Sequence, residues 1–314
     1  MILNTAKQLP AKKILVIGST CVDIIITLDH LPKTAEDLHP LGHTMSLGGC
    51  AYNVASMLRL FGAPVTLISP VGTGIYGEFV KSQLEQRGFP VTVRVQDQEN
   101  GCCYCLVEKN GERTFLSCHG AEYTFQKNWM TPWESEDFSM VYVCGLEIEE
   151  PTGEEIIEYL ESHPERQLFY APGPRGVRIA KEKTERLFRL RPILHINEQE
   201  SYELCGFTDA SKRISLPDAA RQLTRKTGNT VIITLGDKGT YCLEKDGSEY
   251  VIPAVPAKVV DTIGAGDSHI GTCIAAVSLG LPMREAIQLA NRAAAAVVAT
   301  QGSTLSPDQF RRIL

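Results

Sequence analysis

The sequence predicts a doubly wound α/β domain, in which a mostly parallel β-sheet has helices on both faces, together with a small antiparallel β-sheet. Short apolar runs, typical of strands buried on both faces, alternate along the 314-residue chain with stretches of helical character. Two further stretches break this alternation and show no helical period. A chain of this length can form one large domain with a smaller attachment.

The elements of the large domain can be assigned in chain order. The first apolar run ends in Gly18 and is typical of a first buried parallel strand. The expected strands are 13–17, 65–70, 141–144, 168–171, 193–196 and 231–235. The expected helices are 51–61, 77–87, 152–162 and 216–227, and the alanine- and glycine-rich last third predicts two closely packed helices at 272–280 and 285–300.

The two stretches outside the alternation are expected to pair into a separate sheet. In the second stretch, Asn110-Gly111 is a strong hairpin-turn signal, because both residues tolerate positive φ. We expect residues 24–45 and 100–119 to form a lid, and residues 1–23, 46–99 and 120–314 to form the large domain. A sheet inserted at this point is well placed to close over a bound ligand.

The composition excludes several classes of protein. Hydrophobic residues make up 43% and charged residues 22% of the chain, as in globular proteins, and the net charge of −6 argues against a broad nucleic-acid-binding face. Residues 1–13 lack the apolar core of a signal peptide, and no apolar stretch reaches the length of a membrane span. We therefore expect a cytoplasmic protein without nucleic-acid or membrane partners.

The ten cysteines follow no disulfide-framework spacing. Cys102 and Cys105 form a CxxC, but no second motif supplies the remaining ligands of a zinc site. Strand alternation would place Cys103 and Cys105 on one face and Cys102 on the other. We interpret these cysteines as small buried hydrophobic residues.

The most informative segment is 261–268, DTIGAGDS, which lies between an expected strand at 257–260 and a helix from His269. Gly264, Ala265 and Gly266 would allow several backbone N–H groups to converge on an anion. A carboxylate beside an anion site is suited to take a proton from a hydroxyl that attacks a phosphoryl group, which is the role expected of Asp267. The alternative is a glycine-rich turn with Asp267 as a helix cap.

Residues 46–55 predict a second ligand site. Gly48 and Gly49 open a helix and allow close approach of a ligand to the backbone, and Asn53, one turn later, offers both a donor and an acceptor. The alternative is a plain strand-to-helix turn with Asn53 in solvent.

In this order, the motifs resemble those of the PfkB, or ribokinase-like, family of carbohydrate kinases. The resemblance extends from about residue 13 to about residue 307 and rests on Asp23, GGxxxN at 48–53, NxxE at 197–200, TLGxxG at 234–239 and DTxGAGD at 261–267. It implies a ribokinase-like fold and ATP-dependent phosphorylation of a hydroxymethyl group. The acceptor would be a pentose, a hexose, a keto-sugar acid or a nucleoside. The lid and Tyr52 suggest room for a planar group, which slightly favours a nucleoside or a pentose.

The resemblance also implies roles for the residues of the reaction site. Asp267 would be the catalytic base, and Gly264, Ala265 and Gly266 would form the anion hole. The acceptor would be held by Asp23, Gly48, Gly49 and Asn53.

A second group of residues would bind the nucleotide and cations. The nucleotide site would include Asn197, Thr234, Gly236, Gly239 and Asn291. Glu200 would help to hold hydrated Mg²⁺, although Asn followed by Glu three residues later is also an ordinary helix start. Relatives bind a monovalent cation at the positions of Asp261, Gly302 and Ser306, so a K⁺ dependence is a hypothesis.

Two departures bear on the acceptor. Ala171 stands where relatives commonly have Asp, and Cys50-Ala51-Tyr52 follows the glycine pair in place of Lys-Gly-Ala. These departures argue against free ribose as the preferred acceptor. Arg113, on the expected lid, would either reach the acceptor or an incoming phosphate, or lie in solvent. Exposed lid strands often pair across a two-fold axis, so we expect a homodimer.

Two other functions compete with a kinase. Residues 72–77 match GxGxxG, which suggests an NAD-linked oxidoreductase, but they do not lie in the first βα turn. A non-catalytic sugar or nucleotide sensor on the same fold is the other alternative. The intact Asp267 argues against a sensor.

Overall fold

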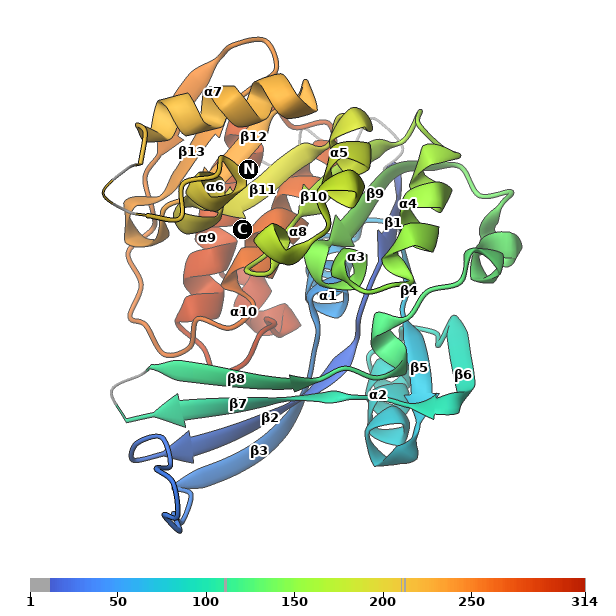
Figure 1. Ribbon diagram of the computed structural model, residues 1–314, viewed down its shortest axis with the longest axis vertical. Helices are drawn as coiled ribbons and strands as arrows, with labels where there is room; N and C mark the ends of the chain where they lie inside the picture. Colours follow the sequence, from blue (N-terminus) through green and yellow to red (C-terminus); the bar gives the residue numbers. More distant parts are fainter. Residues whose placement is uncertain (1–11, 110–111, 210, 212, 314) are drawn as a thin grey trace.

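The computed structural model describes residues 12–109, 112–209, 211 and 213–313. Its largest element is an eight-stranded sheet in the order β14-β13-β12-β11-β10-β9-β1-β4 (Figure 1). The strands are β1 (Lys13–Ile17), β4 (Val65–Ile68), β9 (Phe138–Cys144), β10 (Gln167–Ala171), β11 (Ile193–Asn197), β12 (Val231–Thr234), β13 (Thr240–Leu243) and β14 (Glu249–Ile252). Strands β4 to β12 of this order run parallel, and β13 and β14 add an antiparallel edge.

Helices cover both faces of this sheet, which confirms the doubly wound prediction. The helices are α1 (Cys50–Leu60), α2 (Gly74–Gln86), α3 (Gly145–Glu149), α4 (Gly153–Glu161), α5 (Lys181–Arg189), α6 (Glu198–Leu204), α7 (Leu216–Thr227), α8 (Ala265–Ser278), α9 (Met283–Val298) and α10 (Pro307–Arg311). Ile14 and Val16 of β1 belong to the core on the face covered by α1, α8 and α9, whereas Leu15 and Ile17 belong to the core on the face covered by α4, α5 and α7. All four side chains are at most 1% exposed, and burial of such a side chain contributes roughly 1.5–3 kcal/mol.

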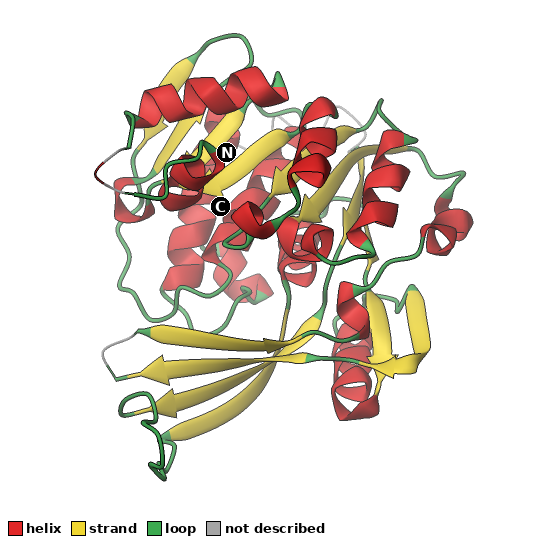
Figure 2. Cartoon of the chain, viewed as in Figure 1, coloured by secondary structure: helices red, strands yellow, loops and turns green. Residues whose placement is uncertain are grey.

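The separate sheet that the sequence predicts is also present. Its order is β3-β2-β7-β8, from β3 (Gly42–Gly48), β2 (Cys21–Leu28), β7 (Cys102–Glu108) and β8 (Arg113–Cys118). The hairpins β2–β3 and β7–β8 are antiparallel and meet along the parallel pair β2–β7. Figure 2 shows this sheet as a layer beside the helices of the main domain. The Asn110-Gly111 turn lies outside the described residues.

A third, two-stranded sheet shows that the GxGxxG segment is not a dinucleotide site. β5 (Pro70–Thr73) pairs only with β6 (Val93–Glu99), outside the eight-stranded sheet. A Cβ on Gly72 would lie 2.6 Å from the Gln98 carbonyl oxygen, and one on Gly77 would lie 2.0 Å from the Gly72 oxygen. These glycines allow close packing of the chain against itself, so they leave no approach for a pyrophosphate.

Two predicted boundaries near the GAGD segment are wrong. Residues 257–260 form no strand, because the backbone N–H groups of Val260 and Asp261 both donate to the Val298 carbonyl at the end of α9. Helix α8 begins at Ala265 rather than at His269, so the motif itself forms the first helical turn. Among the described residues, no helix combines the length and apolar character that crossing a bilayer requires.

Candidate active site

The DTIGAGD segment forms the turn into α8. Gly264 is the N-cap residue, with φ of 73°, and a Cβ there would lie 2.4 Å from the Ser303 carbonyl oxygen. A side chain on Gly266 would meet no atom within 4 Å, so the backbone of this helical turn faces open space. A helix N-terminus with free space in front of its first N–H groups is suited to bind an anion, and of these groups the Ala265 N–H donates to the Thr262 carbonyl oxygen at 3.4 Å.

Asp267 lies in this first turn and is fixed from another helix. Asn53 of α1 donates from Nδ2 to Asp267 Oδ2 at 2.8 Å, and Asn53 Oδ1 accepts from Ser303 Oγ at 2.8 Å. Asn53 is only 4% exposed, so the alternative in which it lies in solvent is wrong. Burial raises the pKa of Asp267 to about 6, and the Asn53 hydrogen bond acts in the opposite direction.

A second carboxylate lies on the lid side of the site. Asp23 is in β2 and is 7% exposed, and a Cβ on Gly48 would lie 2.0 Å from its Oδ2. Gly49 has φ of 100° and passes so close to Ser19 that a Cβ would lie 2.5 Å from the Ser19 oxygen. Burial is the main cause that raises the pKa of Asp23 to about 7. The negative charges of Asp267 and Asp261 contribute to the same rise. The two predicted motifs therefore meet in one electrostatic neighbourhood.

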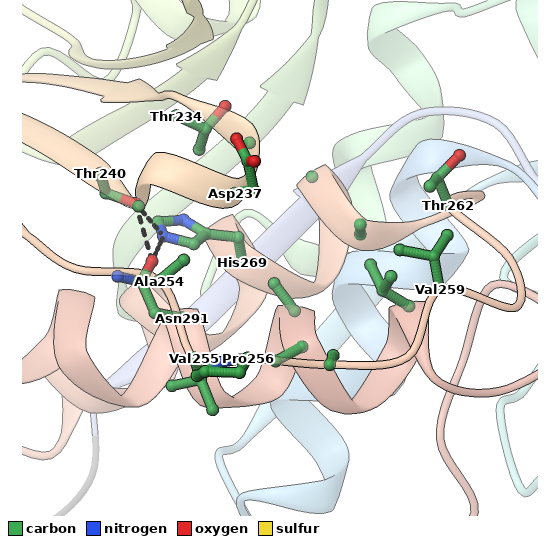
Figure 3. A pocket seen from close by; sticks show the side chains of 18 residues that line it. Thr234, Asp237, Thr240, Ala254, Val255, Pro256, Val259, Thr262, His269 and Asn291 are labelled. Atoms are coloured by element: carbon green, nitrogen blue, oxygen red, sulfur yellow. Dashed lines mark hydrogen bonds between the residues drawn. The ribbon is translucent and has the colours of Figure 1, made fainter.

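A cavity of about 610 Å³ opens on the other side of the GAGD turn (Figure 3). Residues predicted to bind nucleotide contribute to its lining, namely Thr234, Gly236, Gly239 and Asn291, and so do Ala265 and Gly266 of the anion turn. Val255, Val259 and Val298 add apolar surface. This combination of an apolar slot with an anion-binding turn at one end suits an adenine nucleotide.

Comparison with known proteins identifies the family. The pfkB family carbohydrate kinase profile matches residues 11–309. The chain belongs to the pfkB carbohydrate kinase family.

Individual relatives agree with this assignment. The chain is 31% identical over 303 residues to an uncharacterized sugar kinase, YegV, of Escherichia coli, across 96% of this chain and 94% of that protein. A ribokinase from Thermotoga maritima has a TM-score of 0.80 at 23% identity, covering 96% of this chain and 99% of that one. An Arabidopsis thaliana ribokinase complexed with ribose and ATP has a TM-score of 0.78 at 20% identity, covering 97% and 99%.

The family assignment confirms two predictions, the ribokinase-like fold and the ATP-dependent carbohydrate kinase class. It does not test the roles of individual residues, which stay predictions. The structure also shows where the remaining predicted residues of this kinase lie, and which side chains they contact.

Glu147 is a buried carboxylate near Asp267 that the sequence analysis missed. It lies in α3, is 3% exposed, and accepts from the Ser19 backbone N–H through Oε1 at 2.7 Å. Its Oε2 and the Thr20 hydroxyl are buried without a hydrogen-bond partner among the described residues. Burial raises the pKa of Glu147 above its usual range. The one available signal was its position after β9, because carboxyl ends of parallel strands meet at the ligand edge of an open sheet.

Asn291 lines the cavity, but its amide is already bonded within the protein. Its Oδ1 accepts from Thr240 Oγ1 at 2.7 Å, and its Nδ2 donates to the carbonyl oxygens of Ile252 and Pro253 at 3.2 and 3.0 Å. His269 lies 2.9 Å from His195 through ring nitrogens, and burial lowers the pKa of His269 to about 4. These buried groups form a neutral, satisfied floor under the cavity.

The NxxE segment adjoins Thr234, which lines this cavity, but Asn197 and Glu200 are not among the lining residues. Asn197 ends β11 directly beside Thr234 of β12, and it is the N-cap of α6. Asn197 Oδ1 accepts from the Glu200 N–H at 2.8 Å, while the Glu200 carboxylate accepts from Asn197 N and Nδ2 at 2.9 and 2.8 Å. Asn197 and Glu200 therefore form the ordinary helix start that the sequence also allowed. The Glu200 carboxylate keeps further lone pairs that can accept from a water.

Arg113 reaches from the lid to the GAGD loop. Its Nη2 lies 3.0 Å from Asp261 Oδ1, its Nη1 donates to Thr262 Oγ1, and the Arg113 side chain is 12% exposed. The solvated alternative for this arginine is wrong. Asp261 also accepts from the N–H groups of Ile263 and Gly302, at 2.8 and 3.1 Å. Ser306 instead caps α10, where its Oγ accepts from the Gln309 N–H.

Two residues bear on the choice of acceptor: Tyr52, which the sequence suggested for a planar group, and Ala171, which stands where relatives commonly have Asp. Tyr52 is 1% exposed and packs edge-on against Phe89, with ring centroids 6.1 Å apart. It therefore offers no surface to a planar group, and that argument for a nucleoside is wrong. Ala171 ends β10 at the ligand edge of the sheet, so no carboxylate is supplied from this position.

Proposed function

We propose that this kinase transfers the γ-phosphoryl group of ATP to a primary hydroxyl of a polyhydroxylated sugar of pentose or hexose size. The observation that supports the proposal best is the placement of Asp267, near both the cavity suited to a nucleotide and the buried polar groups around Asp23. Asn53, Glu147 and the Thr20 hydroxyl contribute polar atoms on the acceptor side. Such a wall pairs with hydroxyl groups and not with a planar apolar ring.

Each group in the proposed reaction has one task. Asp267 accepts the proton of the acceptor hydroxyl as that oxygen attacks phosphorus. The N–H groups at Gly264, Ala265 and Gly266, with the N-terminal end of the α8 dipole, stabilise the negative charge on the transferring group. Asp23 and Asn53 orient the acceptor, and the lid excludes water.

The residues present fit a hydrated magnesium ion carried by the nucleotide. Asn197 lies beside Thr234, which lines the cavity, and its side chain is hydrogen-bonded to the Glu200 carboxylate. Mg²⁺ commonly keeps several waters and needs only one or two carboxylates, so Glu200 would hold it through water. The ion would neutralise phosphate charge.

A monovalent cation at Asp261 is part of the proposal. The Asp261 carboxylate is paired with Arg113, so K⁺ would share this negative charge with the guanidinium. We expect replacement of K⁺ by tetramethylammonium to lower kcat, and the effect to be larger in Arg113→Ala, where Asp261 lacks its cationic partner. Unchanged rates in both proteins after exhaustive removal of K⁺ would reject a cation site here.

We also propose a cytoplasmic homodimer whose mobile part is the lid of residues 24–45 and 100–119, hinged on the large domain of residues 1–23, 46–99 and 120–314. All ten cysteines lie within the described residues and are free thiols, in keeping with a reducing compartment.

The test is ADP release with a panel of pentoses, hexoses, keto-sugar acids and nucleosides. We expect one sugar to stimulate ADP release, and Asp267→Asn to lower kcat by about 10²- to 10⁴-fold, the usual contribution of a general base. Asn is isosteric with Asp and still accepts one hydrogen bond, so ATP affinity should stay within a few-fold.

The other outcomes are equally informative. If ATP binds but no acceptor in the panel raises turnover, the sensor alternative is favoured. A nucleoside as the best acceptor would contradict the polyol proposal while leaving Asp267 as the base. Undiminished turnover in Asp267→Asn would refute the assigned base.

A further inference from the structure

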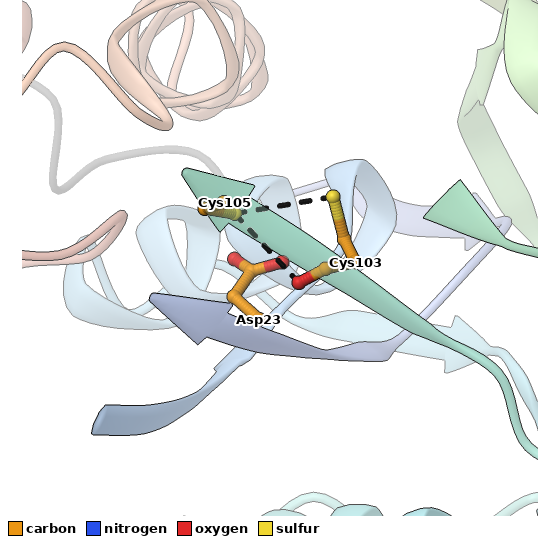
Figure 4. A group of neighbouring side chains, drawn as sticks. All are labelled: Asp23, Cys103 and Cys105. Carbon is orange, nitrogen blue, oxygen red and sulfur yellow. Dashed lines mark hydrogen bonds between the residues drawn. The ribbon is translucent and has the colours of Figure 1, made fainter. Parts of the chain in front are cut away.

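Two cysteines that belong to none of the sequence motifs meet the Asp23 carboxylate at the base of the lid (Figure 4). Asp23 of β2 lies directly opposite Cys103 of the neighbouring strand β7, and Cys105 follows two residues later on the same face. The prediction that Cys103 and Cys105 share a face is therefore confirmed. The interpretation of these two cysteines as mere hydrophobic residues did not anticipate the carboxylate beside them.

The spacing of the donor atoms fits a small tetrahedral ion. The Cys103 and Cys105 sulfurs are 3.9 Å apart, and one carboxylate oxygen of Asp23 lies within 4.8 Å of both. Two thiolates on one tetrahedral zinc, each about 2.3 Å from the metal, lie about 3.8 Å apart. The two sulfurs are thus already at the separation that a shared ion requires, and the Asp23 oxygen lies close enough to join them.

The surroundings also favour a cation. Among the described residues, the only hydrogen-bond partner of the Asp23 side chain is the weak Cys21 thiol, with Sγ 3.8 Å from Oδ1, and no salt bridge reaches this buried carboxylate. A buried carboxylate without a cation is unfavourable. Ser117 Oγ lies 3.5 Å from Cys103 Sγ and would orient that ligand from outside. Cys103 is half-buried, which leaves a path of entry.

We propose that Asp23, Cys103 and Cys105 form a binding site for a thiophilic divalent cation, zinc in particular. Three protein ligands leave the fourth tetrahedral position for water or another oxygen ligand. Two thiolates select Zn²⁺ over Mg²⁺, which prefers oxygen in octahedral geometry, so this site is separate from the magnesium that accompanies ATP.

The site has a consequence that rests on the proposed function. Asp23 is assigned to the acceptor, so a zinc ion on its carboxylate would compete with the acceptor. Zinc would then inhibit the kinase by raising the KM for the acceptor, without changing the KM for ATP. Zinc binding itself does not depend on that assignment.

The first experiment measures binding without turnover. Reduced protein is titrated with Co²⁺, and absorption is recorded for thiolate charge-transfer bands and the visible bands of tetrahedral cobalt. We expect one ion per chain, displaced by Zn²⁺. A chelator competition should give a zinc affinity lowered about tenfold or more in Cys103→Ser, since even loss of an outer-shell partner costs about 10- to 100-fold.

A matched control uses the same hairpin. Cys118 of β8 lies opposite Cys102 of β7, on the face of the sheet that does not include Cys103 and Cys105. Cys118→Ser should therefore keep the zinc affinity of the wild type. Zinc should raise the unfolding temperature of the wild type and of Cys118→Ser, but not that of Cys103→Ser. Unfolding of the metal-free variants checks that each is folded.

Two results would overturn the site: no thiolate band in the reduced wild type, or equal loss of affinity in Cys118→Ser and Cys103→Ser. A separate result would overturn only its consequence. If zinc binds through Cys103 but does not compete with the acceptor, the metal site stands and the acceptor role of Asp23 is wrong.

Discussion

The proposed base, Asp267, owes its properties to its neighbours. Burial raises its pKa to about 6, while the Asn53 hydrogen bond stabilises its charged form. Burial raises the pKa of Asp23 to about 7, with a smaller contribution from the charge of Asp267. Burial therefore brings the pKa values of both carboxylates near the pH at which a general base is most useful.

The raised pKa of Asp267 predicts an acidic limb in the rate profile. A base acts in its deprotonated form, which is lost as the pH falls below its pKa, so kcat/KM should fall with decreasing pH. We expect an apparent pKa between about 6 and about 7, with a plateau at higher pH. In Asn53→Ala, which removes the donor to the charged form, the limb should move to higher pH. A flat profile of kcat/KM from about pH 5 to about pH 7 would contradict this assignment.

At the scale of the element, the N-terminus of α8 contains two glycines with different tasks. Gly264 needs its residue type for folding, since it has φ of 73° and lies against the Ser303 backbone. Gly266 has helical geometry, and a Cβ on it would have no neighbour within 4 Å, so the fold itself would accept a side chain there. The absence of a side chain at Gly266 leaves space for an anion to approach the backbone of this turn.

A matched pair of alanine variants separates these tasks. Gly264→Ala should lose at least about 1–2 kcal/mol of unfolding free energy from the left-handed backbone alone. Gly266→Ala should be as stable as the wild type or slightly more stable, yet lose about 10²- to 10³-fold in kcat, comparable to loss of an oxyanion-hole donor. Denaturant unfolding and steady-state kinetics measure both effects. Full activity in Gly266→Ala would show that no anion approaches this turn.

At the scale of the whole molecule, the lid sheet has two unlike faces. One face includes Asp23 and, through Arg113, contacts the GAGD loop. The register places Leu116 opposite Tyr104, which lies opposite Ile24, so these residues belong to the other face. On that face Leu116 is 56% and Met45 41% exposed, which suits a contact with a second copy.

The dimer proposal predicts the effect of one charge on this face. Leu116→Glu should convert the dimer to a monomer, because a dimer contact would bury the carboxylate without a partner. Val251→Glu is the control, since Val251 is similarly exposed at 52% but lies in β14, at the edge of the main sheet. Sedimentation velocity measures both. A wild type that remains monomeric at every concentration would exclude the dimer.

Local pattern was sufficient to predict the parallel strands, the lid stretches and the GAGD turn. Apolar runs report burial directly, and a glycine-rich turn before a helix reports an anion site through backbone geometry alone. The same approach failed for residues 257–260, whose backbone bonds to α9, and for Tyr52, whose side chain faces the core. Which face of an element is buried depends on what packs against it.

By itself, the sequence determined the fold class and the order of the motifs, and it predicted the role of Asp267, because each depends on residues close together in the chain. Only the tertiary structure brought Glu147 to Ser19, Arg113 to Asp261 and the thiols of Cys103 and Cys105 to Asp23. These contacts join elements far apart in sequence. Their formation depends on strand register and on how the lid docks, and neither is encoded in a local pattern.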